Sequence, residues 1–500
     1  MALTAEKTLL VAAIGRPSNA GLVEAVRLVD GRIPAVEVRL DALGEPADLP
    51  ALRAAFPGRI LLATLRSRAE GGSFPGTAAD AARLLAGALA AGFDLADVEL
   101  ALGGPSLLGL PPERVVVSAH DFEKTPPDLE ARAAAMEETG ARFAKLVATA
   151  RGLGDALRLL RLQCSRGAGR LAAFGMGEAG LVTRALSPYL GASLAFGAAL
   201  PGEATAPGQL PAVDLLEVYG VGRRRRVESI FALLGGRVSH SFSPAIHNTT
   251  FEARGLPALY VPVALESLGE QLGELRETLG EVGLPLRGAS VTIPFKEEAA
   301  ALAGDEGQRA VNTLVFGGDA GEGGVAGANT DREALLGALP AAPEGGAALV
   351  LGAGGMAGAA VEALLARGWA VDVAARTPER AAALARATGA RAVGGAVSAG
   401  FAYGVVVNAT PLGLDEFDPL PCDGALLGPG VVAVDSPYRR GGTAFSREAL
   451  RRGARVVDGF ALLLAQAAGQ SSLFTGLETS AAELAARLPG RIRSLFEVIP

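Results

Sequence analysis

Short apolar segments separated by stretches of helical period fill the first two hundred residues of the chain. Residues 79–91 and 127–139 are two of the intervening stretches, and both are rich in helix-forming residues. Strands that alternate with helices over about 210 residues predict an α/β fold, a (β/α)8 barrel. The eight strand-length segments begin near Leu9, Ala35, Ile60, Phe93, Arg114, Ala141, Arg170 and Ala192.

Polar side chains gather where these predicted strands end. In such a barrel the carboxyl ends of the strands surround one mouth, and active sites form there. Side chains alternate along a strand, so Glu37, Arg39 and Asp41 are expected to share the interior face. Further polar residues near strand ends are Thr64, Arg66, Glu70, Asp97, Glu99, Ser118, His120, Lys145, Arg184, Thr205 and Gln209.

Two lysines are candidates for chemistry. The chain has four lysines against 42 arginines, and Lys145 and Lys296 both follow apolar residues. Arg cannot replace Lys where the nitrogen must lose its proton, because guanidinium stays charged. Burial and nearby cations would lower the pKa of Lys145, so that its amine could attack a ketone and form an imine. His120, one strand away, would act as general base and acid. A buried stem with a solvated ammonium, and structural ion pairs in the lumen, are the alternatives.

The order of these motifs resembles one family over roughly residues 8–215, type I 3-dehydroquinate dehydratase. The resemblance implies dehydration of 3-dehydroquinate to 3-dehydroshikimate, with the imine on Lys145, proton transfer by His120 and assistance from Glu70. A different Schiff-base lyase or an aldolase on the same barrel is the alternative. The resemblance further implies that carboxylate and hydroxyls are bound by Arg39, Arg66, Arg184 and Gln209, with Glu37 orienting them and Thr205 in place of a serine. Its motifs are Glu37–Asp41, Thr64–Arg66, Glu70–Gly72, Ser118–Phe122, Lys145, Met176–Gly177 and Pro207–Gln209.

A glycine turn in the second half predicts a nucleotide site. The buried strand predicted at 347–351 precedes the turn, and a helical stretch follows it to about Arg367. Free N–H groups and the helix dipole at such a turn favour a pyrophosphate. The next strand ends in Arg376 and Thr377 instead of an acid, and Arg376 with Arg380 suits a 2′-phosphate, which favours NADP over NAD. An ordinary surface arginine is the alternative. The turn comprises Gly352, Ala353, Gly354, Gly355, Met356 and Ala357.

A smaller α/β segment, residues 229–335, precedes this Rossmann unit. Its loop-like clusters are rich in hydroxyls and amides, which both donate and accept hydrogen bonds and so suit a small polyhydroxylated acid. His240 and His247 are interpreted as capping or packing residues. The clusters are residues 239–244, 247–248, 290–296, 311–313 and 327–331.

These clusters resemble shikimate dehydrogenase, and the resemblance spans roughly residues 229–500. It implies that Lys296 beside Asp331 handles the proton, and that Ser241 and Ser243 bind the substrate carboxylate. Departures from the family are Ala375 before Arg376 and Leu462 where Met is common. The resemblance also implies ring-hydroxyl contacts from Thr292, Asn312, Asp331 and Gln466, and substrate or nicotinamide contacts near Asn408, Thr410, Tyr438 and Gly459.

The composition of the chain argues against several other classes of protein. The net charge of −7 gives no basic field for nucleic acid, and two cysteines with three histidines favour neither a disulfide framework nor a metal site. No uninterrupted apolar run reaches about twenty residues, so no membrane span is expected. The strand predicted from Leu9 leaves no room for a signal peptide, which favours the cytoplasm.

The sequence therefore predicts a bifunctional enzyme with two consecutive activities, 3-dehydroquinate to 3-dehydroshikimate and then, with NADPH, to shikimate. The alternatives are a catabolic quinate/shikimate dehydrogenase fusion that uses NAD, and a non-catalytic regulator that binds the ligands. Oligomeric state stays open. The expected divisions are a barrel (1–218), a solvated linker (219–228), a substrate domain (229–335), a Rossmann domain (336–458), and C-terminal helices packing back on the substrate domain (459–500).

Overall fold

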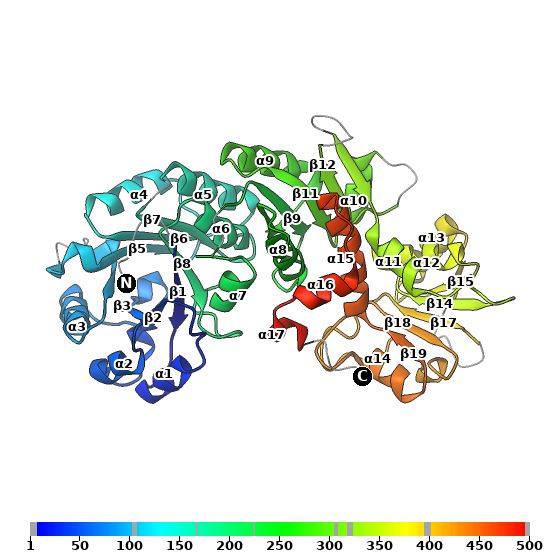
Figure 1. The fold of residues 1–500 in the computed structure, drawn as a ribbon, viewed down its shortest axis with the longest axis horizontal. Helices are drawn as coiled ribbons and strands as arrows, with labels where there is room; N and C mark the ends of the chain where they lie inside the picture. The colour runs from blue at the N-terminus through cyan, green and yellow to red at the C-terminus, as the bar shows by residue number, and fades with distance from the viewer. Residues whose placement is uncertain are drawn as a thin grey trace. The chain divides into compact units, whose positions relative to one another are not determined.

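A computed structural model describes most of the chain (Figure 1). Its described residues are 8–102, 108–166, 169–223, 226–304, 309–317, 324–394 and 402–495. The chain divides into two compact units, and each is described by itself. The first comprises Met1–Pro244 and Pro257–Leu286, and the second comprises Ala245–Leu256 and Arg287–Pro500.

Eight parallel strands form the barrel of the first unit. They follow the order β7-β6-β5-β4-β3-β2-β1-β8, and the N–H of Ser193, just before β8, donates to the carbonyl of Leu171 in β7 at 3.1 Å. The barrel prediction is confirmed, because each strand begins within two residues of its predicted start. The strands are β1 (Leu9–Ile14), β2 (Ala35–Arg39), β3 (Ile60–Thr64), β4 (Leu95–Glu99), β5 (Val115–Asp121), β6 (Phe143–Thr149), β7 (Leu171–Met176) and β8 (Leu194–Ala198).

Helices cover the outside of this barrel. In α3, Thr77 and Asp80 form a reciprocal cap, and Ala81, Leu85 and Ala88 make the buried stripe. The helices are α1 (Asn19–Val26), α2 (Leu49–Ala55), α3 (Ala78–Ala90), α4 (Leu129–Glu138), α5 (Leu153–Ser165), α6 (Leu181–Leu186) and α7 (Ala212–Glu217).

Strand alternation directs the polar groups into the barrel. Phe143 and Val147 of β6 belong to the apolar interior cluster. Lys145 lies between them at the same parity, so its side chain points into the same interior. Side chains from the other strands reach the interior in the same way.

Part of the predicted substrate domain packs within the first unit. Strand β9 (Ser229–Gly235) pairs in parallel with β10 (Ala258–Ala264), and α9 (Leu268–Glu281) follows. Helix α5 packs against α9, and α6 packs against β10.

The expected solvated linker is in part a packed segment. Tyr219 is 3% exposed and Val221 is 2% exposed, because the turn after α7 folds back on the barrel. Arg224 and Arg225 lie outside the described residues. The domain boundaries stay a prediction.

The second unit contains an antiparallel group of strands and several helices. Strand β11 (Leu286–Val291) pairs with β12 (Thr313–Phe316), which pairs with β13 (Val325–Ala328). Helix α15 (Gly459–Thr475) packs on α11 (Thr330–Ala338) and β12. The other helices of this region are α8 (Ser243–Ala253), α10 (Lys296–Ala303), α16 (Ala481–Arg487) and α17 (Gly490–Arg493).

A six-stranded parallel sheet completes the second unit. Its order β16-β15-β14-β17-β18-β19 is that of a Rossmann fold, in which ligands bind where the order reverses, here between β14 and β17. Helices α12 (Gly355–Ala366), α13 (Pro378–Thr388) and α14 (Ala444–Arg451) belong to it. The strands are β14 (Ala347–Leu351), β15 (Ala370–Ala374), β16 (Arg391–Ala392), β17 (Val405–Asn408), β18 (Val432–Asp435) and β19 (Arg455–Val457).

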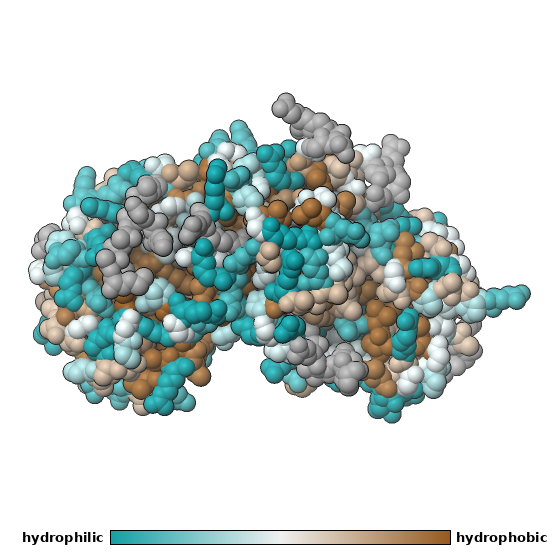
Figure 2. All heavy atoms as spheres, in the orientation of Figure 1, coloured by the Kyte–Doolittle hydropathy of each residue, from teal (hydrophilic) through white to brown (hydrophobic). Residues whose placement is uncertain are grey.

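The surface carries polar and apolar residues together. Figure 2 shows hydrophilic residues over the visible face with hydrophobic ones among them. Among the described residues, no helix combines the length and the apolar character that crossing a bilayer requires.

Candidate active sites

One cavity opens among the carboxyl ends of the barrel strands. All nine residues that the sequence predicts for this half line it. They come from four strands or the turns after them (β2, β3, β5 and β6), from α6, and from the loop between β8 and α7. They are Glu37, Arg39, Arg66, Glu70, His120, Lys145, Arg184, Thr205 and Gln209.

Lys145 is buried in this cavity, with 6% of its surface exposed. Its Nζ donates to Glu37 Oε1 at 3.3 Å, lies 4.0 Å from Asp97 Oδ2, and lies 3.8 Å from the centroid of the Phe196 ring. Burial lowers the pKa of Lys145, and the carboxylates of Glu37 and Asp97 only partly oppose this shift. At a given pH, a larger fraction of Lys145 is therefore neutral than of a lysine in water. Only the neutral amine can act as a nucleophile.

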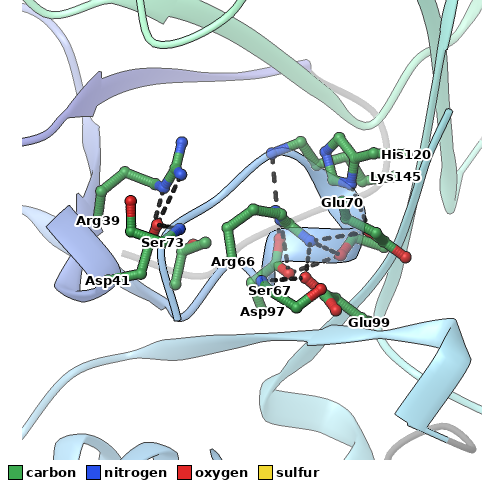
Figure 3. Close-up of polar contacts among 12 residues, drawn as sticks. Arg39, Asp41, Arg66, Ser67, Glu70, Ser73, Asp97, Glu99, His120 and Lys145 are labelled. Atoms are coloured by element: carbon green, nitrogen blue, oxygen red, sulfur yellow. Dashed lines mark hydrogen bonds and ion pairs between the residues drawn. The ribbon is translucent and has the colours of Figure 1, made fainter. Parts of the chain in front are cut away.

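Arg66 is the centre of a buried ion cluster (Figure 3). Its Nη2 donates to Asp97 Oδ1 at 2.9 Å, while Nη1 donates to Ser118 Oγ at 2.8 Å. Nη1 also lies 3.2 Å from oxygens of Glu70 and Glu99. A buried cation needs compensation of this kind. The guanidinium is therefore paired with three carboxylates, of which that of Glu70 also lines the cavity.

Sequence patterns alone assign no role to Asp97, Glu99 or Ser118. The feature that could have identified them is their position at strand ends, next to residues with a predicted role in the site.

His120 and Glu70 form a close pair in the same wall. His120 Nδ1 lies 2.9 Å from Glu70 Oε2. Burial lowers the pKa of His120 well below its usual range, and the charges of Arg66 and Lys145 act in the same direction. Burial also raises the pKa of Glu70 to about 8. The imidazole is therefore neutral at physiological pH and can accept a proton.

Arg39 is held differently from the expectation. Strand β2 ends at Arg39, and Asp41 lies in the short 3-10 turn η1 (Leu40–Ala42). The alternation rule therefore does not extend to Asp41. Its carboxylate instead accepts two hydrogen bonds from Arg39, both 2.8 Å, and one from the N–H of Ser73 at 3.1 Å (Figure 3).

Arg184 is a buried cation that has no counter-ion among the described residues. It is 5% exposed, and its Nε and Nη2 have no hydrogen-bond partner among the described residues. Its guanidinium carbon lies 4.9 Å from the centroid of the Phe174 ring. Burial lowers the pKa of Arg184 to about 10. A buried guanidinium with unpaired donors on a cavity wall is suited to a carboxylate, which it can bind through two N–H groups.

Thr205 and Gln209 line the cavity from the loop after β8. Gln209 Oε1 accepts from the N–H of Thr205 at 2.8 Å and from its hydroxyl at 3.1 Å. Gly208 has φ +68°, and a Cβ there would lie 2.5 Å from the Gly177 carbonyl oxygen. Only glycine fits this contact between the loops after β7 and β8.

Lys296 and Asp331 form an ion pair in the second unit. Lys296 is the first residue of α10 and Asp331 lies in the first turn of α11. Nζ donates to Asp331 Oδ2 at 2.6 Å. A cation at a helix N-terminus opposes the helix dipole, so the carboxylate compensates for an otherwise unfavourable position. The pair is only partly exposed, with 15% of the Lys296 side chain accessible.

Amide and hydroxyl side chains form a hydrogen-bonded chain next to this pair, from the residue before β12, from α11 and from α15. Asn312 Oδ1 accepts from the N–H of Thr330 at 2.9 Å, and Asn312 Nδ2 donates to Thr330 Oγ1 at 3.0 Å. Thr330 Oγ1 lies 3.4 Å from Gln466 Oε1 of α15. The structure thus brings together Asn312 and Gln466, both predicted to bind substrate, and Thr330 lies between them. The sequence gives Thr330 no role of its own beyond its place in the cluster 327–331.

Gln470, one helical turn beyond Gln466, was not singled out. Its Oε1 accepts from Ser290 Oγ at 2.8 Å, and its Nε2 donates to the Asn312 carbonyl at 3.3 Å. Spacing along a helix was the signal that could have found it.

The glycine turn after β14 has the shape of a nucleotide loop. Gly352 has φ +116°, and a Cβ there would lie 2.7 Å from the carbonyl oxygen of Ala409. A Cβ on Gly354, the N-cap of α12, would meet nothing within 4 Å. Open space before free helix N–H groups fits a pyrophosphate. A Cβ on Gly355 would lie 3.4 Å from Lys296 Cδ, so this turn lies beside the lysine.

A second cavity lies beside this turn. Four of the predicted cofactor residues line it, namely Ala353, Gly354, Gly355 and Arg380. Ala357 is buried, while Arg376 and Thr377 are exposed after β15. Gly352, Met356, Ala357, Arg376 and Thr377 are not among its lining residues.

Asn408 shapes the loop after β17. It is fully buried, donates to the Leu412 carbonyl at 3.0 Å and to Asp435 Oδ1 at 2.9 Å, and accepts from Thr410 Oγ1 at 2.7 Å. Asn408 and Thr410 thus stabilise the loop. Tyr438 and Gly459 line a further cavity beside it, and a Cβ on Gly459 would lie 2.3 Å from the Pro437 carbonyl oxygen.

Of the remaining predicted substrate residues, Ser241 and Thr292 lie in loops, and Ser243 is the first residue of α8. Ser241 Oγ donates to Ser243 Oγ at 3.1 Å in the first unit, and Thr292 is half-buried after β11 in the second. His247 is buried, with its ring centroid 5.6 Å from that of Phe474, so the packing interpretation is confirmed for it. His240 is exposed.

Comparison with known proteins finds a matching family for each half of the chain. The family of type I 3-dehydroquinase matches residues 11–224, and the shikimate dehydrogenase substrate-binding domain matches residues 233–314. A shikimate dehydrogenase (NADP(+)) from Rubrobacter xylanophilus is 38% identical over 52% of this chain and 96% of its own length. A bifunctional 3-dehydroquinate dehydratase/shikimate dehydrogenase, chloroplastic, from Arabidopsis thaliana is 29% identical over 88% of this chain and 77% of its own.

Among solved structures, this chain is similar to the dehydroquinate dehydratase and shikimate dehydrogenase from S. pombe AroM. The match covers 97% of this chain and 98% of that one. The identity is 24% and the TM-score is 0.42.

The chain belongs to the shikimate dehydrogenase family and carries a type I 3-dehydroquinase domain in its N-terminal half. It is a bifunctional enzyme of the shikimate pathway, a dehydroquinate dehydratase and a shikimate dehydrogenase in one polypeptide.

Proposed function

We propose that Lys145 and Lys296 carry the two activities. In the barrel, the Lys145 amine attacks the ketone of 3-dehydroquinate and forms an imine with loss of water. The protonated imine withdraws electrons, so the adjacent carbon can lose a proton to His120. His120 then returns a proton to the departing hydroxyl, and hydrolysis of the imine frees 3-dehydroshikimate and Lys145. Glu70 holds the imidazole through the 2.9 Å contact at Nδ1.

The observation that carries this proposal is the unpaired guanidinium of Arg184. It lines the same cavity as the buried Lys145. The cavity therefore offers a nucleophilic amine and a carboxylate site together, as a keto acid requires.

Arg184→Ala is expected to raise the KM of the dehydratase for 3-dehydroquinate by about a hundredfold, the scale of a lost charge-assisted contact of roughly 3 kcal/mol. Steady-state kinetics of the full chain measures this. Arg142→Ala is the matched control, because Arg142 also stacks over a phenylalanine, 5.3 Å from the Phe143 centroid, but does not line the cavity. An unchanged KM in Arg184→Ala would remove the carboxylate assignment.

In the second half, Lys296 donates a proton to the oxygen that becomes the new hydroxyl of shikimate, and Asp331 orients the lysine through the 2.6 Å contact. NADPH, when bound, supplies the hydride. Asn312 and Gln466 lie close enough to the same pair of helices to bind ring hydroxyls. The serines 241 and 243 would receive the carboxylate.

We propose that Arg376 and Arg380 select NADP(H) through its 2′-phosphate. The support is the absence of an acid at the end of β15 and the exposure of Arg376. The glycine turn fits the pyrophosphate because Gly354 leaves open space before the α12 N–H groups.

Arg376→Ala is expected to raise the KM for NADP by about tenfold or more while leaving the KM for NAD nearly unchanged, because only NADP carries the phosphate. Initial rates of shikimate oxidation with each cofactor measure this. Arg386→Ala, an exposed arginine near the end of α13, is the control. An equal rise in the KM for NADP and for NAD would show that Arg376 does not bind the 2′-phosphate.

We also place the enzyme in the cytoplasm and expect small molecules as its ligands, without metal, nucleic acid or membrane. The support is the composition of the chain, with its mild negative charge.

A further inference from the structure

A barrel residue contacts a loop of the dehydrogenase half. Glu178, half-buried in the turn between β7 and α6, accepts hydrogen bonds at Oε1 from the N–H groups of Val238 and Ser239, at 2.6 and 2.8 Å. All three residues belong to the first unit. Hydrogen bonds from backbone N–H groups to a carboxylate are charge-assisted and stronger than neutral ones. One side chain therefore fixes the start of the segment 238–243.

The hydrogen bonds continue from this anchor to the serines. Val238 is buried, and its carbonyl accepts from the N–H of Ser241 at 3.3 Å. Ser241 Oγ accepts from the N–H of Ser243 at 3.2 Å and donates to Ser243 Oγ at 3.1 Å. The positions of both hydroxyls therefore depend on the fixed backbone of Val238 and Ser239.

The barrel side of the contact is rigid. Gly177 donates to the Pro207 carbonyl at 3.2 Å, and the N–H of Gly180 donates to the Gly177 carbonyl at 3.2 Å. A Cβ on Gly180 would lie 2.5 Å from the carbonyl carbon of Gly175, so the turn is tightly packed. Helix α6, which follows this turn, packs against β10. Glu178 is thus held by a packed scaffold, as an anchor must be.

We propose that Glu178 is a positioning residue of the dehydrogenase, supplied by the dehydratase barrel. It holds residues 238–243 so that Ser241 and Ser243 can bind the substrate carboxylate, and it contacts no substrate itself. Glu178 is not among the residues that line the barrel cavity. The inference rests on the proposed function of the two serines.

Glu178→Ala in the full chain is expected to raise the KM for shikimate by about tenfold, because the serines are no longer held where the carboxylate binds. The kcat of shikimate oxidation, the KM for NADP and the kcat/KM of the dehydratase should stay within about twofold, since none of these depends on the serine positions. Glu178→Gln keeps an acceptor oxygen and should cause a smaller rise. Initial-rate kinetics of both activities on one preparation measures all four quantities.

Two further variants make the result decisive. Arg161→Ala breaks the 2.8 Å ion pair with Glu281 between α5 and α9 but leaves residues 238–243 intact, so its KM for shikimate should not change. If Ser241→Ala leaves that KM unchanged, the proposed carboxylate site is wrong. If Ser241→Ala raises it and Glu178→Ala does not, the role of Glu178 is wrong. A rise in Arg161→Ala equal to that in Glu178→Ala would also overturn it, because general loosening would then explain both.

Discussion

Lys145→Arg is expected to reduce the kcat of the dehydratase by roughly ten-thousandfold while the same chain keeps its dehydrogenase activity. Arginine retains the positive charge beside Glu37 and Asp97, but its guanidinium cannot lose a proton or form an imine. Covalent catalysis is therefore lost, although the ion pairs of the cavity wall can persist. Dehydratase assays on the full chain measure the effect, and the dehydrogenase rate shows that the chain is folded.

Borohydride reduction in the presence of 3-dehydroquinate gives a second readout. The unsubstituted chain should retain the substrate carbon skeleton as a stable adduct on Lys145, detectable by mass spectrometry of its peptides. Lys145→Arg should give no adduct. Lys124→Arg is the matched control, since Lys124 is exposed after β5 and should leave both rate and adduct unchanged. An adduct on any other lysine, or full activity in Lys145→Arg, would contradict the Schiff-base assignment.

Lys296→Arg is expected to lower the kcat of the dehydrogenase by roughly a hundred- to ten-thousandfold, the usual contribution of a general acid. The charge beside Asp331 is retained, so binding of shikimate and of NADP should change little. Arginine keeps its proton, and the developing alkoxide is left without a donor. Initial rates of 3-dehydroshikimate reduction by NADPH, together with equilibrium binding of NADP, separate the two effects.

The dehydratase rate of Lys296→Arg serves as the internal control and should equal that of the unsubstituted chain. The two lysine variants should then complement each other: a mixture of Lys145→Arg and Lys296→Arg should oxidise NADPH with 3-dehydroquinate, because 3-dehydroshikimate can diffuse between molecules. Near-normal turnover of Lys296→Arg alone would show that another group supplies the proton.

The sequence predicted the barrel well because strand alternation and apolar runs are local signals. The starts of β1, β2 and β3 match at Leu9, Ala35 and Ile60. The end of β2 was less predictable, because nothing local distinguishes a strand that continues to Asp41 from a turn in which Asp41 pairs with Arg39. The burial of Tyr219 in the expected linker was also not predictable from local sequence, because it depends on tertiary packing.

Candidate residues were easier to find than their partners. Residue type and position after a predicted strand single out both Arg66 and Arg184. Only the structure shows that Arg66 pairs with buried carboxylates, and that Nε and Nη2 of Arg184 have no partner among the described residues. The pairing of Arg66 with Asp97 joins residues 31 positions apart and depends on how the strands are registered. The contact of Glu178 with Val238 spans 60 positions and had no sequence signal at all.

The most direct test of the account follows NADPH absorbance in the unsubstituted chain with 3-dehydroquinate as the sole organic substrate. If both lysines act as proposed, absorbance should fall after a short lag, and shikimate should accumulate in equal amount. The fall should vanish in Lys145→Arg and return when 3-dehydroshikimate is added. A flat trace from the unsubstituted chain with either substrate, or an undiminished fall in Lys145→Arg, would contradict the account.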